Sequence, residues 1–103
     1  MAAHLGIRLI NRGEEGELQL KGRLDTTTAE EASEYFDEAA SRFDHLILNM
    51  EELDYISSAG LRSMKKLHVK MQKKAGTLSV KNANENIMEV FEMTGFAGLF
   101  NFV

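Results

Sequence analysis

The chain of 103 residues contains no cysteine and no proline. Without cysteine it can form no disulfide, thiolate metal site or cysteine nucleophile, and without proline nothing indicates a stiff linker or a proline-rich docking segment. No run of about 18 apolar residues is present, and the first residues do not combine a charged segment with a long apolar stretch. We therefore expect a cytoplasmic protein that does not act at a membrane.

Positive charge is also scarce. The chain has twelve basic and sixteen acidic residues, which gives a net charge of -4. No overall positive field therefore attracts nucleic acid or anionic lipid. The apolar share of 44% and the charged share of 27% are typical of a folded globular protein. A chain of this length fits one modest hydrophobic core. We expect a single domain over residues 1–103.

Recognisable catalytic and cofactor motifs are missing as well. The three histidines, His4, His45 and His68, are far apart and form no metal-binding cluster, and the glycines match neither phosphate-loop motif. Residues 63–66 spell SerXaaXaaLys, but the companion motifs of serine acyl-enzymes are absent. A hydrolase that uses Ser58 would need a base, and the sequence places none beside it. We expect no metal, no cofactor and no enzymatic activity.

Hydrophobic periodicity predicts an α/β fold. Alternating apolar residues predict strands at about 4–12 and 16–23, joined as a hairpin by turn residues at 11–16. Residues 46–48 are apolar on both faces, which is typical of a central strand, and residues 77–81 predict a fourth strand. Helical spacing occupies the segments between and after these strands. The prediction is a mixed four-stranded sheet, an N-terminal β-hairpin then βαβαβα in which the second hairpin strand is the first of the three, with helices packed on it.

Helix boundaries can be predicted from capping residues. Thr27 and Thr28 are each followed three residues later by a glutamate, as in a capping box, and this pattern predicts the start of the first helix. Asn84 is expected to cap a third helix that closes at Gly95. The apolar tail after that glycine is expected to lie against the body as a short final strand.

Residues 54–63 are the stretch around which we expect the chain to be organised. They join the central apolar strand to a helical pattern over residues 61–74, so Ser57 and Ser58 stand at a helix start. Serine is common there because its hydroxyl can accept a hydrogen bond from a free amide. One hydroxyl is enough for a cap, whereas here two lie beside the small Ala59 and Gly60. Capping alone and a second role for one serine both remain open from the spacing.

The same stretch resembles the signature of STAS domains of the anti-sigma factor antagonist family, in which an aspartate is followed by two or three apolar or small residues, then SerSer or SerAla, then GlyLeu. Residues 22–29, 46–53 and 91–96 resemble further parts of that family. The resemblance implies a STAS-like fold and a regulatory phosphoserine at Ser58. Because some members carry aspartate at the position of Ser57, that serine is the alternative acceptor. It also implies a partner-binding face formed by Arg23, Asp25, Thr26, Thr27, Ser57, Ser58, Gly60, Leu61 and Arg62.

The resemblance implies a regulatory circuit. In that family the unphosphorylated protein binds an anti-sigma factor that is also a serine kinase with a histidine-kinase-like ATPase fold, and a sigma factor is released. Phosphorylation ends the complex, and a PP2C-type phosphatase restores the free serine. The resemblance also allows another function, because some STAS domains are constitutive scaffolds or transport-accessory subunits. In that case the two serines would only cap the helix.

Overall fold

The computed structural model describes residues 5–103 and opens with the predicted hairpin. Strand β1 (Leu5–Arg12) and strand β2 (Glu15–Leu24) pair in antiparallel fashion, with Leu9 opposite Leu18. The two-residue connection contains Gly13 at φ +86, a value that glycine adopts at little cost. His4, the predicted first residue of the strand, lies outside the described residues. The alternation of apolar side chains therefore correctly predicted this hairpin.

The remaining elements alternate between helix and strand. They are α1 (Ala29–Arg42), β3 (His45–Ile56), α2 (Ser58–Lys73), β4 (Thr77–Lys81), α3 (Glu85–Thr94), the short 3-10 helix η1 (Phe96–Gly98) and β5 (Asn101–Phe102). The strands lie in sequence order, and every pair after the first is parallel. The α/β class and the mixed sheet are confirmed. The sheet has five strands among the described residues instead of four, because the tail forms the short final strand that was expected of it and pairs with β4.

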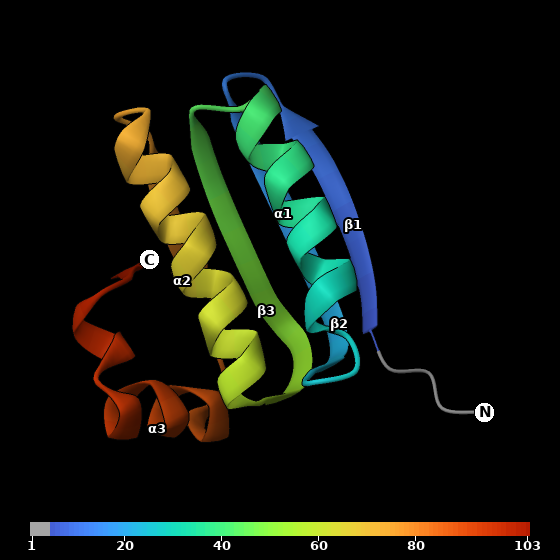
Figure 1. Cartoon of the computed structure of the whole chain (residues 1–103), viewed down its shortest axis with the longest axis vertical. Coiled ribbons are helices and arrows are strands. Elements are labelled where there is room, and N and C mark those ends of the chain that lie inside the picture. The colour runs from blue at the N-terminus through green and yellow to red at the C-terminus, as the bar shows by residue number, and fades with distance from the viewer. Residues whose placement is uncertain (1–4) are drawn as a thin grey trace.

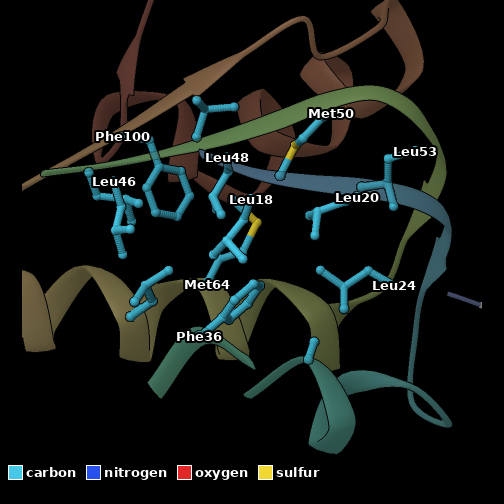
Figure 2. Close-up of a cluster of buried hydrophobic side chains, with 14 of the residues drawn as sticks. Leu18, Leu20, Leu24, Phe36, Leu46, Leu48, Met50, Leu53, Met64 and Phe100 are labelled. Atoms are coloured by element: carbon cyan, nitrogen blue, oxygen red, sulfur yellow. The ribbon is translucent and has the colours of Figure 1, made fainter. Parts of the chain in front are cut away.

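Helices α1 and α2 lie side by side over one face of the sheet, and α3 crosses near the start of α2 (Figure 1). Alternate leucines of β2 and β3 point toward α1 and α2 and meet Phe36 and Met64 in a buried cluster (Figure 2). Phe100, from the segment before β5, joins the same cluster and contacts the ring of Phe91 edge-on. Burial of these side chains provides most of the stabilisation, at about 25 cal/mol per Å² of apolar surface.

Strand β3 is longer than its apolar run, and this length positions the functional end of the sheet. Its buried residues alternate up to Met50 and then recur at every third position, at Leu53 and Ile56. The pairing register with β2 shifts twice along this part, as expected where bulges add residues to one strand. With these shifts, β3 follows β2 to its end, where Ile56 pairs with Leu24.

The two caps predicted for α3 agree with the sequence, and the one predicted for α1 does not. The side chain of Asn84 accepts a hydrogen bond from the amide of Ile87 at 2.9 Å, and Gly95 ends α3 at φ +83, so both predictions are confirmed. The capping box of α1 is wrong, because Thr28 makes no side-chain cap. Its buried hydroxyl instead accepts from the amide of Asp25 and donates to the carbonyl of Arg23, each at 2.9 Å.

Candidate functional site

The carboxyl ends of β2 and β3 bring the two loops of the predicted site together. Arg23 pairs with Tyr55 in the sheet, and the amide of Ser57 donates to the carbonyl of Leu24 at 2.9 Å. The β2–α1 loop and the start of α2 are thereby fixed beside each other. We call the surface formed by residues 23–27 and 55–62 the Ser58 rim.

Gly60 allows α2 to begin close to the end of β2. A β-carbon at this position would lie 2.7 Å from both the side chain and the carbonyl oxygen of Leu24, and 3.0 Å from Ile56. Such contacts are too short for any residue other than glycine to fit without a shift of the backbone. The next residue, Leu61, is buried in the core. Gly60 and Leu61 therefore pack α2 against the sheet, and the exposed part of the rim is formed by the residues beside them.

The two serines differ in what their hydroxyls do. Ser57 is the N-cap of α2, and its oxygen accepts a hydrogen bond from the amide of Gly60 at 3.3 Å. Ser58 is the first residue of the helix and is exposed. Among residues 5–103 its hydroxyl has no hydrogen-bond partner. Ser57 therefore provides the helix cap that the sequence indicated, and the hydroxyl of Ser58 is accessible from solvent.

Asp25 organises the loop opposite Ser58. Its carboxylate accepts from the hydroxyl of Thr27 at 2.7 Å and from the amide of Thr27 at 2.9 Å, and it forms an ion pair with Arg23 at 3.3 Å. These contacts, led by the Thr27 hydroxyl, hold the pKa of Asp25 below its usual value. Thr26 and Thr27 are exposed beside it. The rim therefore presents a fixed, ionised carboxylate to solvent at neutral pH.

Tyr55 belongs to this surface although the sequence did not single it out. The side chain is 42% exposed, and the guanidinium of Arg23 lies over its ring at 4.2 Å from the centroid, a cation–π arrangement. Tyrosine and arginine are enriched among the residues that dominate protein–protein interfaces. An aromatic residue at an exposed strand position has no distinctive spacing. Only the pairing of β2 with β3 places Tyr55 beside Arg23.

Arg62 extends the rim along α2 and is exposed. It lines a surface hollow of about 340 Å³ between the starts of α1 and α2, together with residues that include Glu30 and Lys66. In the lining of this hollow, the hydroxyl of Ser63 donates to the carbonyl of Ala29 at 3.2 Å and accepts from the hydroxyl of Ser33 at 3.1 Å. The serine of the SerXaaXaaLys pattern thus joins two helices.

The described part of the chain offers neither a metal-binding cluster nor a membrane-spanning helix. Among residues 5–103 no three histidine, cysteine, aspartate or glutamate side chains are grouped so that they could hold an ion. No helix in the same range is both long and apolar enough to cross a bilayer. The groups that the rim exposes are hydroxyls, one carboxylate, an aromatic ring and two guanidinium groups, which are suited to protein recognition.

The mixed sheet carries two helices on one face, and the two serines lie at its β3–α2 junction. The chain matches the STAS domain family over residues 8–103 and belongs to it. It is 32% identical over 85 residues to BtrV of Bordetella bronchiseptica, a candidate anti-sigma factor antagonist, and the match covers 79% of this chain and 71% of that protein. The predicted family is therefore confirmed.

Solved structures agree on the fold. The chain is similar to the anti-sigma factor antagonist SpoIIAA in its unphosphorylated form, with a TM-score of 0.82 and 19% identity over 95% of this chain and 88% of that one. It is also similar to the phosphorylated form of the Bacillus cell fate determinant SpoIIAA, with a TM-score of 0.74 and 20% identity over 95% of this chain and 91% of that one. At these identities the likeness concerns the fold alone.

Proposed function

We propose that this chain is an anti-sigma factor antagonist controlled by phosphorylation of Ser58. In its unphosphorylated form it binds an anti-sigma factor that is also its serine kinase, and the bound sigma factor is released. The observation that carries the proposal is the contrast between the serines, because the Ser57 hydroxyl is used in capping α2 whereas Ser58 is exposed. The family membership and the name of the relative BtrV support the same function.

Phosphorylation would change the charge of the rim without refolding it. A phosphate adds about 1.5 to 2 negative charges at neutral pH, and Asp25 on the neighbouring loop is held in its ionised form. The added charge accumulates with that carboxylate and with the exposed Asp54 on β3. An acidic or desolvated partner surface that accepts the neutral hydroxyl is then repelled. A loss of about 3 to 4 kcal/mol would weaken binding some hundredfold to a thousandfold.

The docking face would comprise the exposed residues of the rim, with Gly60 and Leu61 holding α2 in place beneath them. A PP2C-type phosphatase would remove the phosphate and restore binding. Such an enzyme must reach the phosphoserine directly. The position of Ser58 at the exposed start of α2 satisfies that requirement.

The test uses the purified chain and a candidate partner, an anti-sigma factor serine kinase with a histidine-kinase-like ATPase fold. After incubation with ATP, intact-mass measurement should show a gain of one phosphate, and peptide mapping should assign it to Ser58. Ser58→Ala should take up no phosphate and still bind the kinase, whereas Ser58→Asp should bind poorly. Ser57→Ala is the matched control, because it keeps the acceptor and loses only the cap.

Two results would contradict the proposal. Normal labelling of Ser58→Ala together with none of Ser57→Ala would move the site to Ser57. Equal binding by wild type, Ser58→Ala and Ser58→Asp, with no phosphate gained by any of them, would instead favour a constitutive scaffold or a transport-accessory subunit.

A further inference from the structure

A row of cations begins one turn after Ser58 on the exposed surface of α2. Arg62 follows the serine by four residues, and Lys65 and Lys66 follow by seven and eight, so all lie near one stripe of the helix. All three are exposed, and together with Val69 they line a surface hollow of about 410 Å³. The first turn of α2 holds no acidic residue. This positive stripe contrasts with the net charge of -4 of the chain.

Arg62, like Lys65 and Lys66, forms no ion pair among residues 5–103, whereas two lysines farther along do. Lys70 contacts Asp37 at 2.6 Å, and Lys74 contacts Asp44 at 3.3 Å and the carbonyl of Phe43 at 3.2 Å. These lysines join α2 to α1 and the segment that follows it. Glu30 lines the same hollow as Arg62, yet the two form no ion pair. The guanidinium is thus available to a group that arrives on its own helix.

We propose that Arg62 is the internal receptor of the phosphate on Ser58, an inference that rests on the proposed function. An acidic group four residues before a basic one is the favourable order on a helix, and guanidinium can bind phosphate oxygens in bidentate fashion. Arg62 therefore holds the phosphate against α2 and favours its dianionic form. It is a positioning residue for the modified state and touches nothing that reacts.

This contact has a consequence for phosphomimetic variants. A phosphoserine extends far enough from the first turn to meet a side chain one turn ahead, and it carries up to two charges. An aspartate at the same position is shorter and carries one charge. Ser58→Asp therefore reproduces the repulsion at the rim with a weaker contact to Arg62 than the phosphate makes, and should mimic phosphorylation incompletely.

The test needs no kinase, because phosphoserine can be inserted at position 58 during translation. A ³¹P NMR titration of the intact chain then reports the second pKa of the phosphate, which is about 6 for a free phosphoserine. In Arg62→Gln this pKa should be higher than in the Arg62 protein by about 0.15 to 0.4 pH unit, as expected for a helix-surface pair. Arg62→Lys should restore part of the difference, since it keeps the charge and loses the bidentate geometry.

Lys73→Gln is the control, because it removes one exposed cation from the last turn of the same helix. Its phosphate should titrate as in the unsubstituted chain. Equal titration of all variants, or a shift in Lys73→Gln as large as that in Arg62→Gln, would overturn the proposal. These results are independent of whether any kinase modifies Ser58, so they separate failure of the contact from failure of the proposed function.

Discussion

Two carboxylates with lowered pKa values occupy different surroundings in this domain. Glu17 on β2 is 1% exposed and contacts Arg12 at 2.7 Å, Asn49 at 2.9 Å and Lys81 at 3.9 Å. These partners come from β1, β3 and β4, and we call them with Glu17 the Glu17 network. The hydrogen bond from Asn49, supported by Gln19 and Arg12, lowers the pKa of Glu17 to about 2.

Asp25 also has a lowered pKa, but its partners belong to its own loop. The Glu17 network joins four strands, and its contacts with Asn49 and Lys81 are distant in sequence, so it stabilises the sheet. The contacts of Asp25 are local, so they shape a surface. The origin of the partners, and not the direction of the pKa shift, therefore distinguishes a carboxylate that holds the fold together from one that is available for recognition.

The largest loss of stability should come from Gly60→Ala. It would show that one residue of the Ser58 rim is needed for the packing of α2 against β2. The added methyl group would meet the carbonyl of Leu24 and force α2 away from β2. We expect a loss of about 3 kcal/mol in the free energy of unfolding, as for an overpacked site, measured by urea denaturation. Gly98→Ala is the control, because nothing lies within 4 Å of the added atom there. Equal stability of the two variants would contradict the close packing.

Glu17→Gln should cause the next largest loss of stability, and it tests whether the Glu17 network stabilises the sheet. It removes the charge that receives hydrogen bonds from Arg12 and Asn49, and it leaves an amide group facing other donors. We expect a loss of about 2 kcal/mol at neutral pH, in the range for hydrogen bonds to a charged group. Glu14→Gln, exposed in the hairpin turn, should change stability by less than about 0.5 kcal/mol. Similar losses in both variants would show that burial of Glu17 contributes nothing.

Acid titration should sharpen the same contrast. The folded pKa of Glu17 is about 2 and its ordinary value is 4.5, so between these values the unfolded chain binds more protons. The stabilisation by Glu17 is therefore complete above pH 4.5 and is lost as the pH falls toward 2. Stability measured across this interval should fall less steeply in Glu17→Gln than in wild type. Parallel curves would assign the acid sensitivity to other carboxylates.

How much of the fold could be predicted from the sequence depended on whether buried residues recurred at a regular spacing. Strand β4 was predicted at its observed bounds, because alternation persists over its whole length. The second half of β3 was not, since its buried residues occur at every third position after Met50. The capping box failed because Thr28 is bonded to Arg23 and Asp25. That contact depends on how the loop folds and leaves no trace in residue spacing.

The candidate site was predictable in its location and less so in its detail. The strand-to-helix turn at Ser57 and Ser58 is visible in sequence because an apolar run meets a helical pattern. Which serine caps the helix could not be decided, since either hydroxyl suits a cap until the phase of α2 is known. Tyr55 was missed because its importance arises from Arg23, 32 positions earlier in the chain, through strand pairing.

The smallest predicted effect is the most informative for the serines. Ser57→Ala should destabilise the protein by about 1 kcal/mol, because the amide of Gly60 loses its cap. Ser58→Ala should leave thermal stability unchanged within the scatter of surface substitutions, since its exposed hydroxyl supports no contact among the described residues. Measured side by side by thermal denaturation, the variants separate the structural serine from the accessible one. Equal destabilisation would mean that both hydroxyls hold the helix start, and it would remove the physical reason for assigning the regulatory role to Ser58.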